Sequence, residues 1–510
     1  MKCQTATFKS QPLLHLFLSL LVLSSLSCSA SPRLRKEGAA TNPVARLRAQ
    51  IQEALQDSAL AQTRTGIKVV SLKSGEVLFE RDSRLLFHPA SNMKLLTTAT
   101  ALEKLGPNFR FKTLLLADSL ATGDSLIVGN LYLKGFGNPD LSTSDLRWMV
   151  QKLWQTGIRK ISGDLVCDES YFDDLYLGSG WMWDDASDED FSPISGLAVN
   201  HNCVTVVVRP GTAPGDSLSV QLQPPTSFVR IENLGVTVDS TDTTRLKAFR
   251  VERKWQQHEN TVVVDGGLTP QSEPEEFVIE IENPALYTGT LFAELLAAQG
   301  IRFAGRISPG VAPDSLNALV EHRSPPLSVL ILHTNKESDN LYAEMLLKTL
   351  GAQVRGLPGT AEKGIAVINA FLDSVGIDTT TYELADGSGV SRYNVVSPEH
   401  IIELLRVMNA DFRVQAEFKA SLPIAGVDGT LKERMQDTAA AGKLRAKTGS
   451  LRGVSTLSGY TTTAEGEPLA FSLMMEHFVG STSKIRQIQD RIGALLSSFR
   501  RGVLAGKKEN

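Results

Sequence analysis

The chain has 510 residues, with 52 Lys and Arg and 56 Asp and Glu side chains, so its formal net charge is −4. Hydrophobic residues make up 42% and charged residues 21%, an ordinary globular composition that excludes a wholly disordered or a collagen-like chain. The near-neutral balance gives no electrostatic footprint for a nucleic-acid partner. At about 100–200 residues per domain, the length predicts two to four domains.

The first 30 residues have the order of a secretory signal peptide. Lys2 and Lys9 precede an apolar run over 13–26, and small residues follow it. The run is shorter than the ~20 residues of a membrane-spanning helix, although an uncleaved anchor is the alternative. Cys28 also loosely resembles the lipidated cysteine of a lipoprotein. We therefore expect a signal peptide at 1–30, a protein of the periplasm or cell envelope, and membrane contact only through an uncleaved signal or a lipid on Cys28.

Two cysteines, Cys167 and Cys203, lie beyond this segment. Export permits a disulfide between them, and two buried free thiols are the alternative. The sequence leaves both open. No cysteine–histidine spacing is typical of a zinc site.

In chain order, a polar linker at 31–43 precedes a predicted helix at 44–60, two hairpin strands at 66–70 and 76–80, and a helix at 91–106. Residues 107–200 mix strands with one helix near 143–156 and an aromatic, acidic loop. Residues 203–285 are short alternating strands separated by turn residues, which predicts a small β domain. A helix and one strand over 302–308 lead to a boundary near 325.

Helices return in the last third of the chain. Helical patterns cover 338–350, 360–375, 397–408 and 483–500. An antiparallel strand pair, formed by 443–463 and 469–477, precedes the last of these helices.

The first chemical motif is Ser91-Asn92-Met93-Lys94, at the start of the predicted helix 91–106. A spacing of three puts the serine and the lysine on one helix face. A neutral lysine amine beside a serine hydroxyl can accept its proton. The four-residue pattern is weak alone, since Ser481 and Lys484 also match it; there we expect a plain surface helix start.

The second motif, Ser338-Asp339-Asn340, begins another predicted helix, and capping alone explains these residue types. The third, Lys447-Thr448-Gly449 with Ser450, lies in a strand pattern, where glycine permits close approach of a ligand. Residues 73–75 (Lys-Ser-Gly) have similar composition but precede Ser91 in a predicted turn.

Together and in this order, the three motifs resemble those of the penicillin-recognising serine enzymes, S-x-x-K, S-D-N and K-T-G. About 250 residues separate Ser91 from Ser338, too many for a compact β-lactamase. The chain is similar to class C low-molecular-mass penicillin-binding proteins of the S13 peptidase type. Supporting stretches are HPASNMK, LKGFGNPDL, GWMWDD, ADGSGVSRYN and AKTGSLRGVSTLSGY. Asn138 and Arg452 depart from the family, which often has Asp and Gln there.

The resemblance implies an α/β (α+β) fold with two inserted domains, one nested in the other. A β-lactamase/transpeptidase-like domain, with an antiparallel sheet flanked by helices and an all-helical part, is expected at 44–106 and 325–500. A mixed inserted domain is expected at 107–200 and 286–324, a nested β-rich domain at 201–285, and a tail at 501–510.

The resemblance also implies a D-Ala-D-Ala carboxypeptidase and endopeptidase that acts on peptidoglycan stem peptides and is acylated by β-lactams, without cofactor or metal. Ser91 is the expected nucleophile and Lys94 the base. The backbone N–H groups of Ser91 and Ser450 would form the oxyanion hole. Ser338 and Lys447 would pass a proton to the leaving amine, and Asn340 would hold the substrate amide. The terminal carboxylate would bind at Lys447, Thr448, Gly449 and Ser450.

Further residues match family positions with less specific roles. Arg392 matches a position that lines the substrate pocket, and a surface arginine is the alternative. Asp168 and Phe172 match an inserted-domain motif that would touch the stem peptide. Trp181 and Trp183 are expected to pack. Rival functions are a β-lactamase or esterase on the same fold, and a catalytically silent cell-wall-binding protein.

Overall fold

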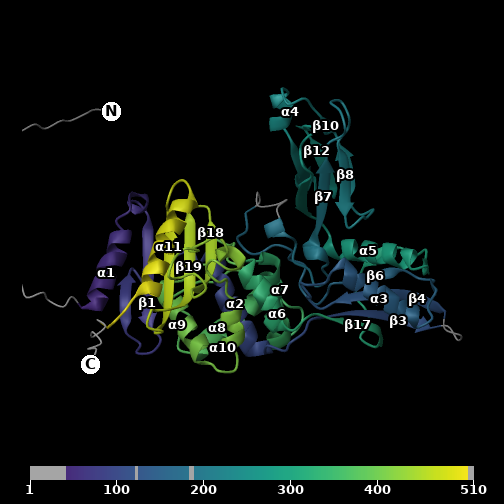
Figure 1. The fold of residues 1–510 in the computed structure, drawn as a ribbon. Coiled ribbons are helices and arrows are strands. Elements are labelled where there is room, and N and C mark those ends of the chain that lie inside the picture. The colour runs from purple at the N-terminus through teal and green to yellow at the C-terminus, as the bar shows by residue number, and fades with distance from the viewer. Residues whose placement is uncertain (1–41, 121–124, 183–188, 503–510) are drawn as a thin grey trace, which may run out of the picture. The chain divides into compact units, whose positions relative to one another are not determined.

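The structure is a computed structural model that describes residues 42–120, 125–182 and 189–502. The predicted signal peptide, Cys28, Trp183 and the end of the predicted tail lie outside the described residues. The fold mixes helices and sheets, as the α/β (α+β) prediction requires (Figure 1). Within the described residues, no helix is long and apolar enough to cross a membrane.

A five-stranded antiparallel sheet joins the two ends of the described chain. Its order is β18 (Arg445–Leu451), β19 (Val454–Thr462), β20 (Pro468–Glu476), β1 (Arg64–Ser71) and β2 (Val77–Arg81). The helices α1 (Pro43–Ala54) and α11 (Thr482–Ser498) bury their apolar stripes in one core with this sheet. α9 (Pro398–Ala410) packs against β1 and β20 in the other core. β18 is the edge strand of this sheet, and residues 423–425 pair with the beginning of its outer edge.

A helical group shares the core that contains α9. It consists of α2 (Met93–Leu105), α6 (Leu327–Lys336), α7 (Asn340–Arg355), α8 (Ala361–Ser374) and α10 (Gln415–Ser421). α2 and α7 are buried along almost their whole length and contact each other. The first residues of both helices belong to the predicted motifs, so helix packing brings two distant motifs together.

The segments between the first two motifs form separate sheets. A seven-stranded sheet combines β3 (Lys112–Leu120), β4 (Leu126–Gly135), β5 (Lys160–Ile161), β6 (Leu165–Asp168), β15 (Arg302–Phe303), β16 (Ile307–Pro309) and β17 (Ala318–Arg323). α3 (Thr143–Gln155) and α5 (Pro284–Ala298) belong to its hydrophobic core. The boundaries of the inserted domains stay a prediction.

Residues 203–280 form three small sheets. One joins β14 (Glu275–Glu280), β7 (Cys203–Arg209) and β8 (Ser219–Gln223); a second joins β11 (Arg250–Arg253), β12 (Thr261–Asp265) and β9 (Arg230–Asn233); a third pairs β10 (Val236–Thr237) with β13 (Gly267–Leu268). The short helix α4 (Thr243–Lys247) interrupts them. The strand-rich character predicted for this stretch is thus present.

Several predicted elements need correction. The first helix ends at Ala54, not near residue 60, and the strand predicted over 302–308 is two short strands, β15 and β16. The predicted strand 443–463 folds back at Arg452-Gly453, where Gly453 has a φ of 73°, so the expected pair is three strands. Only two residues separate Leu451 from Val454, and such tight hairpins need a residue that tolerates positive φ.

Both described cysteines are buried free thiols. Cys167 lies in the core beneath the seven-stranded sheet, and its pKa is raised to about 12 by burial. Cys203 Sγ lies 3.2 Å from Ser192 Oγ. The structure therefore supports the unpaired alternative.

Candidate active site

Ser91 lies in a short 3-10 turn, Ala90–Asn92, immediately before α2. Ala90 is fully buried with a φ of 46°, a left-handed conformation that costs an ordinary residue energy. Gly389 allows the close approach that holds this turn, because a Cβ on Gly389 would lie 1.9 Å from the Ala90 carbonyl oxygen. The strained turn is thus held in place by packing, and it presents Ser91 at the end of a buried helix.

Lys94 lies one turn further along α2 and is fully buried. Its Nζ lies 3.1 Å from Ser91 Oγ, 2.6 Å from Asn340 Oδ1 and 2.8 Å from the Ser388 carbonyl oxygen. The amide and the carbonyl oxygens can only accept hydrogen bonds, whereas the hydroxyl can also donate. A neutral amine has two N–H donors and one lone pair, so neutral Lys94 can donate to these two oxygens and direct its lone pair at Ser91.

Burial lowers the pKa of Lys94 to about 8, against the opposing effect of the Asp386 and Glu344 carboxylates. Glu344 is itself fully buried, and its Oε1 accepts hydrogen bonds from the backbone N–H groups of Gly387 and Ser388. Burial first, and Asp386 second, raise the pKa of Glu344. These carboxylates hold the 386–389 turn whose carbonyl oxygen contacts Lys94.

The second motif faces the first. Ser338 has a φ of 69°, and its hydroxyl accepts a hydrogen bond of 2.8 Å from Lys447 Nζ. Asn340 Nδ2 donates one hydrogen bond to the Asp190 carbonyl oxygen. Asp339 points away as the N-cap of α7, where its Oδ1 accepts from the backbone N–H of Tyr342. Capping therefore explains the middle residue of the motif but not its neighbours.

The third motif lies on β18, beside the Ser91 turn. Lys447 is fully buried, and burial together with the nearby Lys94 charge lowers its pKa well below the usual value. A Cβ on Gly449 would lie 2.2 Å from Thr456 Oγ1 and 3.0 Å from the Ser91 nitrogen. Glycine is thus required for the strand to pass this close to Ser91. The neighbouring Ser450 is exposed on the edge strand.

A cavity of about 440 Å³ connects these groups. The residues that line it are Ser91, Asp190, Phe191, Glu337, Ser338, Asn340, Gly389, Val390, Thr430, Arg434, Thr448, Gly449, Ser450, Leu451 and Arg486. All three motifs contribute, although they are separated by about 250 and 110 residues in the chain. The cavity thus brings together the Ser91 nucleophile, a second hydroxyl, an amide and a strand edge, with the buried amine of Lys94 at 3.1 Å from Ser91 Oγ, a set of groups suited to acyl transfer.

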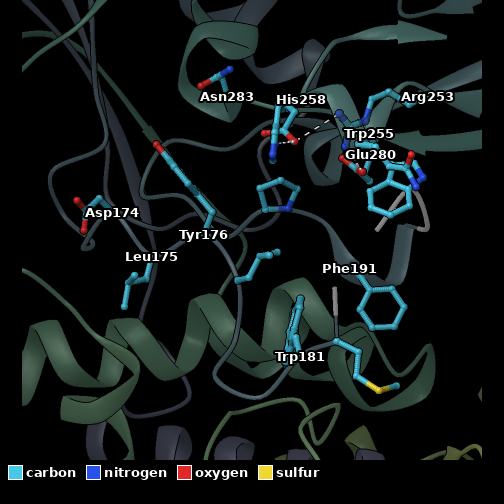
Figure 2. Close-up of a pocket in the computed structure, with 15 residues that line it drawn as sticks. Asp174, Leu175, Tyr176, Trp181, Phe191, Arg253, Trp255, His258, Glu280 and Asn283 are labelled. Atoms are coloured by element: carbon cyan, nitrogen blue, oxygen red, sulfur yellow. Dashed lines mark hydrogen bonds and ion pairs between the residues drawn. The ribbon is translucent and has the colours of Figure 1, made fainter. Parts of the chain in front are cut away.

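A larger cavity of about 710 Å³ lies beside it and shares Phe191 (Figure 2). Its lining is largely apolar and includes Tyr176, Trp181 and Trp255. Trp181 packs against the neighbouring core and donates a hydrogen bond to Asp386, as a packing role predicts. None of the three sequence motifs lines this cavity, so its size does not make it the site of chemistry.

Three predicted substrate-binding residues do not line the cavity of the motifs. Asp168 is fully buried, pairs with Lys134 at 3.0 Å and accepts a hydrogen bond from the Ala312 backbone. Phe172 is 3% exposed and packs in a core with residues of α7. Both side chains are enclosed in this structure, and their contact with the stem peptide stays a prediction. Arg392 donates to the Arg452 carbonyl oxygen at 2.9 Å.

The sequence reasoning missed the buried carboxylates Glu344 and Asp386 and the basic pair Arg434 and Arg486. Glu344 lies within a helical apolar pattern, where a single acid carries no signal. Arg434 and Arg486 lie in segments far from any motif. Only Asp386 had a signal, because it belongs to the quoted stretch ADGSGVSRYN.

Comparisons with known proteins agree with this geometry. The model of the D-Ala-D-Ala carboxypeptidase 3 (S13) family matches residues 47–498. A D-alanyl-D-alanine carboxypeptidase from an Actinomadura species is 35% identical over 483 residues, which cover 92% of this chain and 87% of that protein. The D-alanyl-D-alanine carboxypeptidase DacB of Haemophilus influenzae is 29% identical over 409 residues, or 80% and 84%.

A solved structure is also similar. The crystal structure of penicillin binding protein 4 (dacB) from Haemophilus influenzae matches with a TM-score of 0.78 and 26% identity, over 88% of this chain and 99% of that one. A second structure of that protein, with a TM-score of 0.71 and 25% identity over the same shares, is complexed with a novel β-lactam. The family match over most of the sequence and the extent of these similarities show that the chain belongs to the D-Ala-D-Ala carboxypeptidase (S13) family of serine peptidases.

Proposed function

We propose that this protein hydrolyses the D-Ala–D-Ala bond of peptidoglycan stem peptides through an acyl-enzyme on Ser91, in the cell envelope, and that penicillin acylates the same oxygen. The observation that carries this proposal is the surroundings of Lys94 Nζ, which suit a neutral amine directed at the Ser91 hydroxyl. The similar Haemophilus protein solved with a β-lactam supports the inhibitor class.

In the first step Lys94 takes the proton of Ser91 Oγ as the Oγ–C bond to the substrate carbonyl forms. The backbone N–H groups of Ser91 and Ser450 receive the oxyanion. The C–N bond then breaks, and the leaving amine takes a proton through Ser338 and Lys447, whose side chains are 2.8 Å apart. Water attacks the acyl-enzyme, releases the new carboxylate and returns the proton to Ser91.

Binding of the substrate carboxylate determines which of the two lysines, Lys94 or Lys447, is protonated when acylation begins. Two buried lysines close to each other do not both hold a charge. Near neutral pH, therefore, only one of the two amines is protonated to an ammonium. An anion at Thr448 and Ser450 favours charged Lys447. Charged Lys447 in turn favours neutral Lys94, the form that can act as a base.

The rate constant for penicillin acylation is therefore expected to fall above pH 8, about tenfold per pH unit. Burial lowers the pKa of both amines, that of Lys94 to about 8, so the pair loses its last proton above this pH and no ammonium then remains on Lys447 to bind the carboxylate. Stopped-flow acylation from pH 6 to pH 10 measures this limb. A rate that still increases from pH 8 to pH 10 would contradict the shared proton.

Endopeptidase action is a second function that one observation favours. Arg434 and Arg486 line the cavity together with Thr430, whose hydroxyl lies 2.7 Å from the hydroxyl of Thr448. Arg434 is neutralised by Asp490 at 2.7 Å, whereas Arg486 makes no ion pair with any described residue. A leaving group that is a second stem peptide carries additional carboxylates, and exposed Arg486 is placed to bind one of them.

Digestion of purified peptidoglycan with mass analysis of the products tests both activities. Wild type is expected to release D-alanine and to open cross-links. Arg486→Gln should open cross-links about fivefold more slowly, since an exposed ion pair contributes up to about 1 kcal/mol, while D-alanine release stays unchanged.

Arg491→Gln is the matched control, because Arg491 is exposed on the same helix and pairs with Glu53 outside the cavity. If both arginine variants lower both activities equally, Arg486 does not select the larger leaving group. If neither product forms with wild type, the proposed function itself is wrong.

A further inference from the structure

Two histidines converge on the middle residue of the second motif. His201 Nδ1 lies 3.2 Å and His333 Nε2 lies 3.0 Å from Asp339 Oδ2. The three donor atoms all lie within 4.8 Å of one another. The histidines are 132 positions apart in the sequence, so no spacing pattern predicts the cluster.

Each of the three side chains is positioned by a different structural element. His333 is in the last turn of α6, and Asp339 is fixed because its Oδ1 caps α7. His201 follows Asn200, and both residues have left-handed φ values of 58° and 50°. Asn200 Nδ2 donates to Thr143 Oγ1 at 2.8 Å, which anchors this unusual backbone. The geometry of the three donors therefore does not depend on one flexible loop.

The aromatic ring of Tyr342 packs against both imidazole rings. Its ring centroid lies 4.5 Å from that of His333 and 5.3 Å from that of His201. Its hydroxyl donates to Asp140 Oδ1 at 2.6 Å. The rings thus have fixed planes, with one nitrogen of each directed at the same carboxylate oxygen.

The donors open into a cavity of about 540 Å³ that adjoins the motif cavity, and Asp190, Glu337 and Asn340 line both. Acidic side chains of Glu189, Asp190, Glu337 and Asp339 line it. Among the described residues, none of its lining side chains is a lysine or an arginine. The local field therefore favours a cation over an anion.

We propose that His201, His333 and Asp339 bind a divalent transition-metal ion of the Zn²⁺ type. Two imidazoles and one carboxylate are a common ligand set for Zn²⁺, with a fourth position left for water on the cavity side. Tetrahedral ligands at ~2.0–2.1 Å from Zn²⁺ lie about 3.3 Å apart. The 3.0 and 3.2 Å contacts to Asp339 approach that spacing, and the two imidazole nitrogens lie within 4.8 Å of each other.

This site goes beyond the proposed function, since the acyl transfer requires no metal. A bound ion would act on the position of the second motif. Asp339 lies between Ser338 and Asn340 in the chain, so the ion fixes the backbone that presents both of these side chains to the motif cavity. The ion would also tie the segment of His201 to α6 and α7.

Titration of the chelator-treated, dialysed full chain with Zn²⁺ and, separately, with Co²⁺ tests the proposal. Isothermal calorimetry is expected to give one equivalent with a dissociation constant of about 1 μM or lower, and Co²⁺ to give the visible bands of a tetrahedral N/O site. His201→Ala and His333→Ala should each weaken Zn²⁺ binding by about 100-fold or more. His322→Ala is the matched control, because His322 pairs with a single carboxylate, Asp145, elsewhere.

Two results would overturn the metal site. One is wild type that binds less than about 0.1 equivalent of Zn²⁺ at 100 μM; the cluster is then a hydrogen-bonded triad only. The other is Zn²⁺ binding that is equally strong in the His201 and His333 variants. The wild-type titration does not depend on how the variants fold, and the circular dichroism spectrum and melting temperature of each variant, measured without metal, report folding separately from metal binding.

Discussion

Lys94→Ala is expected to lower the rate constant for penicillin acylation by about 10³-fold, within the 10²–10⁴ range of a positioned general base. Lys94 Nζ lies 3.1 Å from Ser91 Oγ, and burial lowers the pKa of Lys94 to about 8. Alanine removes the proton acceptor and leaves the Asn340 and Ser388 oxygens without their donor. Stopped-flow acylation with a fluorescent penicillin measures the effect.

Lys484→Ala is the matched control for this variant. Ser481 and Lys484 repeat the serine–lysine spacing, but Ser481 only caps α11 and Lys484 is exposed. The control should acylate at the wild-type rate. If Lys94→Ala acylates within tenfold of wild type, Lys94 is not the base. Lys94→Ala removes a member of a buried hydrogen-bonded cluster and can therefore destabilise the fold. Circular dichroism and the melting temperature distinguish such a loss of folding from a loss of catalysis.

Local patterns predicted much of the fold. The periodicity around Lys94 and the stop at Gly106 placed α2 to within two residues, and strand alternation located β1 and β2. The β18–β19 turn was missed because Gly453 interrupts a continuous strand pattern without a change of composition. α6 and α10 were missed for a different reason: they are short helices whose boundaries are set by tertiary packing.

The motifs could be recognised because their order and spacing are specific, and residues of all three line one cavity. The residues that hold the motif side chains in place were not predictable from the sequence. Glu344 acts through backbone N–H groups 43 and 44 residues away, and only folding reveals such a contact. For Asp168 and Phe172, similarity to a family motif suggested a ligand role, which stays a prediction. Both side chains are buried, and Asp168 pairs with Lys134.

Ser91→Ala is expected to have the largest effect, a loss of D-alanine release of at least about 10⁴-fold, because removal of a serine nucleophile eliminates the covalent route. Another hydroxyl of the same cavity is that of Ser338, whose hydrogen-bond partner is Lys447. Ser338→Ala should therefore slow the reaction but preserve the acyl-enzyme. Release of D-alanine from a D-Ala-D-Ala peptide, followed with a coupled assay, measures both variants.

The central claim is that Ser91 carries the acyl group, and mass spectrometry after incubation with penicillin tests it most directly. The wild-type chain is expected to gain the mass of one intact penicillin, and the peptide that contains Ser91 to carry it. Ser91→Ala should gain none under the same conditions. An adduct on Ser338, or full labelling of Ser91→Ala, would contradict the account.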